Sequence, residues 1–226
     1  MPALAVTTTM LRTLPVLSRF SDAQLGQLMP RLQHRSYPRH TSIVRAGEKS
    51  DALYIIVSGK AKVVIEDERG REATLATLGS GEIFGELSFI DEKPRSASIV
   101  GLEHCEVLYI PRAAFAQCLM SNFDASLYLL TYVIRRLRQA NEKIASLALM
   151  DVRGRVARVF LDFAHDVDGQ STVDIGSEEI ARMVGASREM VSRVIKEMIE
   201  SGMVRRDKRK IIVLDRAALP HSEVVH

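Results

Sequence analysis

The chain has 226 residues, of which 46% are hydrophobic and 26% are charged, and its net charge at pH 7 is +3. This is the composition of an ordinary globular protein, and it excludes a disordered, collagen-like or disulfide-rich chain. The length exceeds that of a typical single domain, so we expect one large domain or two unequal ones. The net charge is too small to indicate a nucleic-acid partner by itself.

The distribution of apolar and cysteine residues predicts a cytoplasmic protein without a membrane span or a metal. No uncharged apolar run approaches the roughly 20 residues that a transmembrane helix needs. Residues 1–14 lack the charged start, long apolar stretch and cleavage site of a signal peptide. Cys105 and Cys118 are too few for a four-thiolate zinc or iron–sulfur site, so we expect two buried free thiols.

Residues 20–111 have the pattern of a short helix followed by an antiparallel barrel or sandwich. Ser21 is a good helix-opening residue, and Leu25 and Leu28 follow at helical spacing within 20–32. Short β-branched runs separated by glycine turns come next, which is typical of antiparallel strands. The expected strands are 52–57, 61–65, 73–78, 97–101 and 106–110.

Helix returns after Pro111, first over residues 112–119 and then as one long helix over 124–150. The apolar positions of the long helix alternate steps of three and four, which is the seam pattern of a coiled coil. A helix with its own seam needs a partner, so we predict a parallel homodimer, although packing within the chain could use part of the stripe. Residues 151–154 are the expected hinge. The seam positions are Leu127, Leu130, Ile134, Leu137, Asn141, Ile144 and Ala148.

From residue 151 onward the chain predicts a winged helix-turn-helix domain. The expected helices are 152–165, 177–184 and 187–201, and the expected β-branched runs are 204–205 and 211–214. We therefore divide the chain into a β domain over 1–123, a long helix over 124–150 and a DNA-binding domain over 151–226.

The segment FGELSFIDEKPRSAS, residues 84–98, has the chemistry of a phosphate-plus-sugar site. Gly85 before a turn exposes backbone N–H groups, Arg95 and Ser96 offer a charge and a donor for a phosphate, and Glu86 can accept from ribose hydroxyls. From this chemistry alone, a polar β-hairpin with a surface Glu–Arg pair is an equally good interpretation.

The segment from Ile175 to Ile199 predicts the helix-turn-helix itself. Ser177 and Ser187 are expected N-caps, and Gly185 is expected to make the tight turn. The buried face of the second helix would comprise Val191, Val194, Ile195 and Met198, and its exposed polar face Arg188, Glu189, Ser192 and Arg193. Arginine can pair bidentately with guanine, and glutamate can accept from cytosine, so this face can read base edges. The alternative is an ordinary charged helix surface.

With both segments and the long helix in place, the chain resembles the CRP/FNR superfamily of bacterial transcription regulators over about residues 17–214. The Gly-Glu-Leu turn and the Arg-Ser-Ala strand start are similar to its phosphate-binding cassette, and RRLRQANEKIASLALMDVRGRVARV is similar to its dimerisation helix and hinge. The resemblance implies an α+β fold with an N-terminal antiparallel β-roll (the cyclic-nucleotide-binding domain), a long dimerisation helix and a C-terminal winged helix-turn-helix domain.

The resemblance also implies roles for individual residues. Glu86 would bind the ribose 2′-hydroxyl, Arg95 and Ser96 the cyclic phosphate, and the backbone around Gly85 and Leu87 would line the pocket. Arg188, Glu189 and Arg193 would read a half-site containing TGA in a palindromic operator, while Ser192 resembles the oxygen-sensor branch. The residues expected at the DNA are Ser187, Arg188, Glu189, Ser192 and Arg193. The implied partners are double-stranded DNA, RNA polymerase and a second copy of the chain.

The sequence departs from the cyclic-AMP branch in the long helix, where adjacent Thr and Ser reach the adenine from both subunits. Ala140 and Asn141 stand at these positions. Ala140 cannot hydrogen-bond a base with its side chain. Asn141 could contact the ligand or could only fix the register of a coiled coil. Cyclic AMP is the expected ligand, with cyclic GMP, cyclic di-GMP and a ligand-independent regulator as alternatives.

Several other interpretations are less well supported. Five of the six residues 205–210 are basic and fall at the wing, where phosphate contact and a solvated turn are equally open.

The chain lacks the N-terminal cysteine cluster of a redox sensor, and His34, His40 and His104 do not have the spacing of haem ligands. An enzyme lacks any catalytic motif, and the glycines of 79–85 do not have dinucleotide-loop spacing. A nucleotide-binding module without a DNA target would not need the helix-turn-helix.

Overall fold

The computed structural model describes residues 6–49, 51–208 and 210–220 of the chain. It divides into two compact units, Met1–Leu137 and Arg138–His226, and helix α5 (Phe123–Leu149) crosses the boundary between them. Each unit has its own hydrophobic core. The division at residues 123 and 150 stays a prediction. No helix within the described ranges is both long and apolar enough to cross a membrane.

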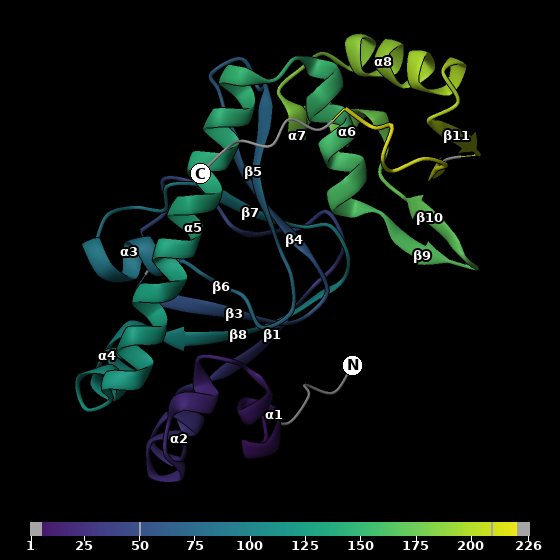
Figure 1. Ribbon diagram of the computed structural model, residues 1–226. Coiled ribbons are helices and arrows are strands. Elements are labelled where there is room, and N and C mark those ends of the chain that lie inside the picture. The colour runs from purple at the N-terminus through teal and green to yellow at the C-terminus, as the bar shows by residue number, and fades with distance from the viewer. Residues whose placement is uncertain (1–5, 50, 209, 221–226) are drawn as a thin grey trace. The chain divides into compact units, whose positions relative to one another are not determined.

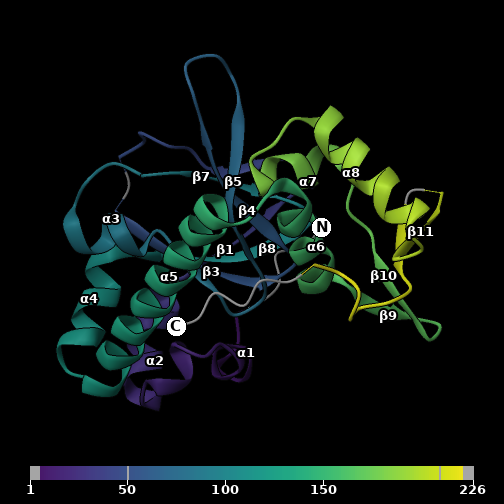
Figure 2. The ribbon, with the colours of Figure 1, turned by 45° about the horizontal axis from the view of Figure 1, so that its top comes forward.

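The first unit is built on two four-stranded antiparallel sheets, with strand orders β1-β8-β3-β6 and β2-β7-β4-β5 (Figure 1). The long β4–β5 hairpin projects from the roll beyond its neighbouring strands (Figure 2). This β-roll confirms the predicted antiparallel architecture. The strands are β1 (Gln33–Tyr37), β2 (Ser42–Val44), β3 (Ala52–Ser58), β4 (Ala61–Glu66), β5 (Glu72–Leu78), β6 (Ile83–Phe84), β7 (Ser98–Gly101) and β8 (Cys105–Pro111).

Short helices accompany the roll. A capping box, in which Ser21 and Gln24 satisfy each other's backbone N–H groups, opens α2, as the helix-opening role of Ser21 predicts. The helix expected over 20–32 is shorter, because a 3₁₀ turn containing Pro30 follows it and proline breaks helical hydrogen bonding. The helices of this unit are α1 (Thr8–Thr13), α2 (Asp22–Leu28), α3 (Glu86–Asp91) and α4 (Arg112–Met120), with 3₁₀ turns at Leu17–Arg19 and Met29–Arg31.

Helix α5 has two apolar faces with different surroundings. Ala125, Leu129 and Tyr132 are buried in the core of the first unit. The predicted seam lies on another face, and its large apolar side chains are between 43% and 63% exposed within the single chain. Internal packing therefore uses a different row of residues from the seam. These exposed side chains are Leu127, Leu130, Ile134, Leu137 and Ile144.

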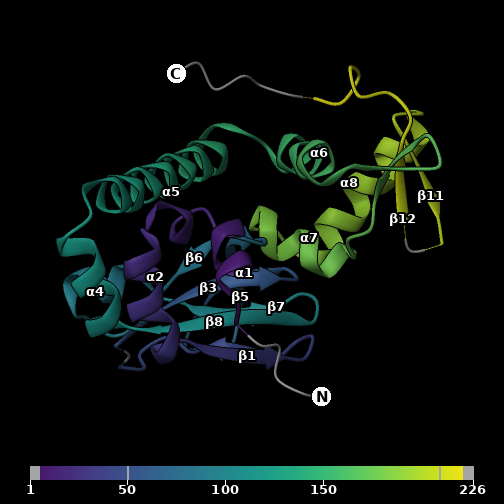
Figure 3. The ribbon, with the colours of Figure 1, turned by 90° about the horizontal axis from the view of Figure 1, so that it is seen from below.

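The second unit packs three helices against each other and adds a four-stranded sheet of order β11-β12-β10-β9 (Figure 3). Its core comes from one buried row on each helix together with Val173, Val204 and Ile211. The elements are α6 (Val152–Phe163), β9 (His165–Val167), β10 (Gln170–Val173), α7 (Ser177–Val184), α8 (Arg188–Glu200), β11 (Val204–Asp207) and β12 (Lys210–Val213).

Three local expectations for this unit are wrong. The predicted hinge over 151–154 is mostly helix: the Asp151 side chain accepts from the Gly154 N–H, so α6 already begins at Val152 and only Met150 and Asp151 separate it from α5. Ser177 is the first helical residue, and Gly176 stands at the N-cap. The helix expected to reach His165 ends at Phe163, because His165 pairs with Thr172 as a strand.

Candidate functional site

Gly85 turns the chain from strand β6 into helix α3. Its φ of +83° lies in the left-handed region, which glycine adopts without steric cost. A Cβ at this position would stand 2.1 Å from Nη1 of Arg95 and 3.1 Å from the carbonyl oxygen of Ala52. Glycine is therefore needed here twice, for the backbone conformation and for the close approach of Arg95.

Arg95 is held inside the roll by backbone carbonyls. It is only 5% exposed; Nη1 donates to Gly85 O at 2.9 Å, and Nη2 donates to Ala52 O at 2.7 Å. The guanidinium also lies 5.5 Å from the ring centroid of Tyr54. Burial lowers the pKa of Arg95, yet an arginine stays protonated at neutral pH. The result is a fixed positive charge in a desolvated position.

Glu86 begins α3 and is 8% exposed. Burial raises the pKa of its carboxyl group, and the charges of Arg136 and Arg95 offset part of that rise. The alternative of a polar hairpin with a surface Glu–Arg pair is wrong, because both side chains are buried and a helix, not a strand, follows Gly85. A buried carboxylate and a buried guanidinium are costly, so they are typical of a site that binds a polar ligand.

These residues meet in one pocket of the first unit. Gly85, Glu86, Leu87, Arg95 and Ser96 all line it, so the structure brings together every cassette residue that the sequence singled out. Strand β7 begins at Ser98, so Arg95 and Ser96 lie in the preceding loop and not at the strand start that we expected. The remaining lining residues are Val44, Val63, Ile83, Phe84, Ser88, Ala97, Ile99 and Arg136.

Arg136 is a charged pocket residue that sequence reasoning missed. It comes from α5, and its charge acts directly on Glu86. Its position in the run RRLRQ resembles an ordinary solvated helix face, and only tertiary packing distinguishes it from its neighbours. Asn141, the other predicted ligand contact on α5, is exposed and belongs to the second unit, so its role stays a prediction.

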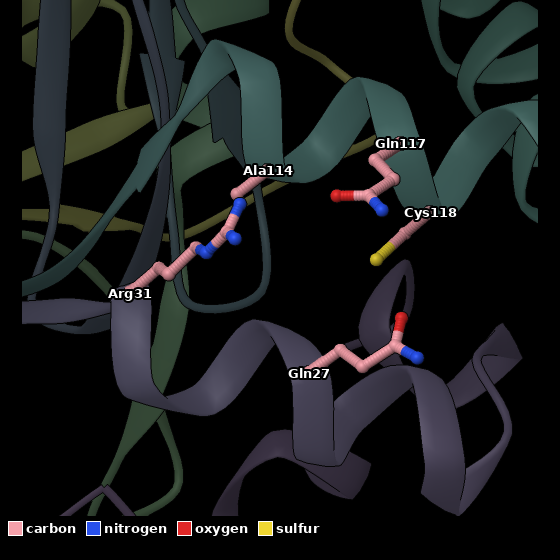
Figure 4. A pocket seen from close by; sticks show the side chains of 5 residues that line it. All are labelled: Gln27, Arg31, Ala114, Gln117 and Cys118. Carbon is pink, nitrogen blue, oxygen red and sulfur yellow. The ribbon is translucent and has the colours of Figure 1, made fainter.

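A separate pocket of about 240 Å³ lies between α2 and α4, and none of the cassette residues lines it (Figure 4). Cys118 is one of the residues that line it, and both cysteines are buried free thiols, as the sequence predicts. Burial raises the pKa of each thiol, so both are protonated at neutral pH. Within the described ranges, no group of three or more His, Cys, Asp or Glu side chains could hold a metal ion.

The helix-turn-helix of the second unit has the predicted geometry. Gly185 adopts a φ of +65° after α7, and the Ser187 side chain accepts from the Met190 N–H at 3.2 Å to cap α8. Inside the unit, Lys143 of α5 donates to the Met183 carbonyl at the end of α7, and Leu147 lies against Gly185. The turn is therefore fixed on both sides.

The outer face of α8 consists of polar side chains that are free of other described residues. Its buried row is the expected one, Val191, Val194, Ile195 and Met198. The side chains on the other face form no hydrogen bond or ion pair with any residue that the structure describes, and all are exposed. They are Arg188, Glu189, Ser192 and Arg193, and Ser187 is exposed beside them.

The wing follows α8 as the hairpin β11–β12, in which Asp207 pairs with Lys210. Arg205, Arg206 and Lys208 are exposed on it, and Lys210 is partly buried. Arg209, the remaining basic residue of this segment, lies outside the described residues. The exposed charges are compatible with phosphate contact and also with a solvated turn.

A β-roll pocket with two buried charged side chains, in one chain with a long helix and a winged helix-turn-helix, defines a ligand-binding protein with a DNA-binding domain. Comparison with known families agrees: residues 34–122 match the cyclic nucleotide-binding domain, and residues 154–221 match the Crp-like helix-turn-helix domain. The chain belongs to the CRP/FNR family of cyclic-nucleotide-binding, DNA-binding transcription regulators.

Its curated relatives are matched over nearly their whole length. The chain is 35% identical over 198 residues to the cAMP-activated global transcriptional regulator Vfr of Pseudomonas aeruginosa, which covers 84% of this chain and 92% of Vfr. It is 34% identical to the CRP-like cAMP-activated global transcriptional regulator of Mycobacterium tuberculosis, with coverage of 86% and 90%.

Among solved structures, the c-di-GMP responsive global regulator CLP of Xanthomonas campestris superposes with a TM-score of 0.76 at 25% identity, covering 86% of this chain and 100% of that one. FixK2 of Bradyrhizobium japonicum, at 20% identity and a TM-score of 0.72, shares the fold over 83% of this chain and 95% of its own. The relatives are transcription regulators, in agreement with the sequence analysis.

Proposed function

We propose that the protein is a cyclic-AMP-responsive regulator that binds a palindromic operator as a homodimer. The observation that carries this proposal is the burial of Glu86 and Arg95 in one pocket with the Gly85 turn. Two desolvated charges of opposite sign are expensive to maintain, and a ligand that carries both a phosphate and sugar hydroxyls satisfies both of them.

Within this pocket, the residues have distinct roles. The Arg95 guanidinium and the exposed Ser96 hydroxyl bind the cyclic phosphate, and Glu86 accepts a hydrogen bond from the ribose 2′-hydroxyl. The backbone around Gly85 and Leu87 approaches the sugar–phosphate closely because Gly85 has no side chain. Arg136 adds a second positive charge from α5, so the ligand is bound by the roll and by the long helix together.

The base is inferred from the relatives, whereas the sugar–phosphate is inferred from the pocket. Relatives at 34–35% identity are named for activation by cAMP, whereas the structural neighbour CLP is named for its response to c-di-GMP. Ala140 cannot bond a base, and the exposed Asn141 could do so from either copy of a dimer. Cyclic di-GMP is therefore the second candidate, and cyclic GMP is a third.

Calorimetric titration of the purified protein with the three nucleotides in parallel tests this proposal. Cyclic AMP should bind at micromolar concentration or tighter, with one nucleotide per chain. Selective binding of cyclic di-GMP would mean that the pocket serves the larger ligand. No binding of any of the three would contradict the proposed function and leave a ligand-independent regulator.

The partner of α5 is a second copy of the chain. The large apolar seam side chains are exposed, and they repeat at coiled-coil spacing over several turns. A lone polar Asn141 within such a seam fixes the register of a parallel pair. Two-fold symmetry then presents two α8 helices to two half-sites, about 34 Å apart on the same side of the DNA.

The α8 face reads DNA in this proposal. Arg188 and Arg193 can each bond guanine in the major groove, and Glu189 can accept from cytosine, which suits a half-site containing TGA. Ser187 and Ser192 contribute hydroxyls beside them. RNA polymerase is the further partner, since activation by this class of regulator acts on transcription.

Nucleotide binding controls this activity by changing α5. A ligand held by the roll and by Arg136 stabilises one position of the helix, and the end of α5 carries that change to the helix-turn-helix through the contacts of Lys143 and Leu147. A coupling free energy of about 1 to 3 kcal/mol is enough for a useful response.

A further inference from the structure

Three side chains of α5 face strand β6 and the residues on either side of it. Arg135 and Arg136 follow Tyr132 by three and four residues, so all three side chains lie on the same side of the helix. Tyr132 Oη donates to the Ile83 carbonyl at 2.5 Å, and Arg135 Nη2 lies 3.8 Å from Oε1 of Glu82. Arg136 lines the pocket that contains Glu86.

The Tyr132 contact is the most protected of the three. Tyr132 is 3% exposed and packs in the same core cluster as Ile83, and the guanidinium of Arg135 lies 5.2 Å from its ring centroid. Burial raises the pKa of the Tyr132 phenol, so its hydroxyl remains a donor at neutral pH. The Arg135–Glu82 pair is more exposed and longer, and such pairs contribute little.

The Ile83 carbonyl, which accepts from Tyr132, lies next to the proposed nucleotide site. Ile83 is the first residue of β6, lines the pocket and precedes Gly85 by two residues. Any shift of the Gly85–Glu86 turn is therefore passed to the Ile83 carbonyl through a short stretch of backbone. Because a buried carbonyl that loses its donor is strongly disfavoured, Tyr132 has to follow that carbonyl.

We propose that Tyr132 is a positioning residue that transmits nucleotide binding from the Gly85–Glu86 turn to α5, and so sets how strongly the nucleotide promotes DNA binding. Arg136 lines the pocket, whereas Tyr132 does not. Its role is therefore in the response and not in the affinity for nucleotide. This inference rests on the proposed function.

The test compares Tyr132→Phe with Tyr128→Phe. Both remove one hydroxyl from α5, one helical turn apart, but the Tyr128 hydroxyl bonds no described residue and its ring lies beside Arg19. The measurements are cyclic AMP affinity by calorimetry and operator affinity with and without saturating cyclic AMP. In Tyr132→Phe, nucleotide affinity should stay within about threefold of the parent, while the nucleotide-dependent gain in operator affinity falls about tenfold. Tyr128→Phe should behave as the parent protein.

Other outcomes overturn the inference. If Tyr132→Phe keeps the full nucleotide-dependent gain, or loses nucleotide affinity in proportion to that gain, Tyr132 has no transmitting role. If Tyr132→Phe lowers the melting temperature but keeps the nucleotide-dependent gain in operator affinity, Tyr132 contributes to stability alone. If Tyr128→Phe loses as much of that gain as Tyr132→Phe, the effect belongs to α5 in general. If cyclic AMP does not change operator binding by the parent protein, the proposed function itself is contradicted. This result is distinguishable from a failure of the Tyr132 inference alone, in which the parent still responds to cyclic AMP.

Discussion

The nucleotide pocket and the outer face of α8 use the same kinds of charged side chain in opposite settings. In the pocket, Glu86 and Arg95 are 8% and 5% exposed, and Arg95 bonds two backbone carbonyls. On α8, Arg188, Glu189 and Arg193 are exposed and bond no described residue. Changes in the pocket should therefore alter folding stability and binding together, whereas changes on α8 should alter binding alone.

The largest effect is expected from Arg95→Ala. This variant removes the phosphate-binding charge and the hydrogen bonds that Arg95 donates to the carbonyls of Gly85 and Ala52, although the Gly85 carbonyl still accepts from the Phe89 N–H. Cyclic AMP affinity should fall at least about 100-fold, and the free energy of unfolding by about 2 to 4 kcal/mol. Calorimetry and urea denaturation measure the two losses.

Arg95→Lys is the companion variant, which keeps a charge but cannot reproduce the forked geometry. It should retain the fold and lose an intermediate amount of affinity. A normal cyclic AMP affinity in both variants contradicts the role of Arg95.

A third surface, the exposed seam of α5, should behave as an interface. Leu137→Glu places a charge in the middle of the seam, and the dissociation constant of the dimer should rise about 100-fold, since a buried apolar contact is replaced by a desolvated carboxylate. Sedimentation equilibrium measures this change. Gln139→Glu adds the same charge at an exposed position on the face of α5 opposite the seam and should leave the dimer intact, so an equal response of the two variants argues against the seam.

On the DNA side, Arg193→Ala should weaken binding to a TGA-containing operator by about 1 to 3 kcal/mol without shifting the melting temperature. Arg206→Ala, on the wing, is its control. Loss of a phosphate contact should weaken all sequences equally and reduce the slope of affinity against salt by about one. If Arg193→Ala changes only the salt slope, the base-reading face has been misassigned. If Arg206→Ala changes nothing, the wing is a solvated turn.

The smallest effect is expected from Glu86→Gln, and it separates stability from binding. Burial raises the pKa of Glu86 above its unfolded value, so the folded state holds a proton more tightly. The folded state therefore loses stability as the pH rises from the unfolded pKa of this group to its folded pKa. Without nucleotide, the variant should melt at a higher temperature than the parent at pH 8, with the difference shrinking toward pH 5. Cyclic AMP binding should weaken about tenfold. Glu189→Gln, on exposed α8, should shift neither quantity, and an identical pH profile in Glu86→Gln and the parent contradicts the burial argument.

Sequence reasoning succeeded where local pattern and burial coincide. The β-branched strands of the roll, the long helix, the Gly185 turn and the Ser187 cap follow from periodicity and turn residues, whereas the cap predicted at Ser177 is wrong. Strand β1, QHRSY, was missed because it carries little apolar alternation and is ordered by pairing with β8. The same limit applies to the site: Gly85, Glu86 and Arg95 stand in one motif, whereas Arg136 joins them only through the packing of α5.

The burial of Glu86 and Arg95 was likewise invisible in the sequence. Charged residues in a polar segment favour a surface position, and no local signal shows that these two side chains are buried. The exposed seam of α5 was predicted correctly as a stripe. The buried row that contains Tyr132 was not, because two apolar faces on one helix overlap in a linear pattern.

The most direct test of the account is the affinity of the protein for a labelled palindromic operator with TGA half-sites, measured at fixed salt with and without saturating cyclic AMP. We predict that cyclic AMP tightens binding to this operator by about 10-fold or more and leaves binding to a scrambled operator unchanged. Equal affinity in the presence and absence of cyclic AMP, or equal tightening on both DNAs, would contradict nucleotide control of sequence-specific binding.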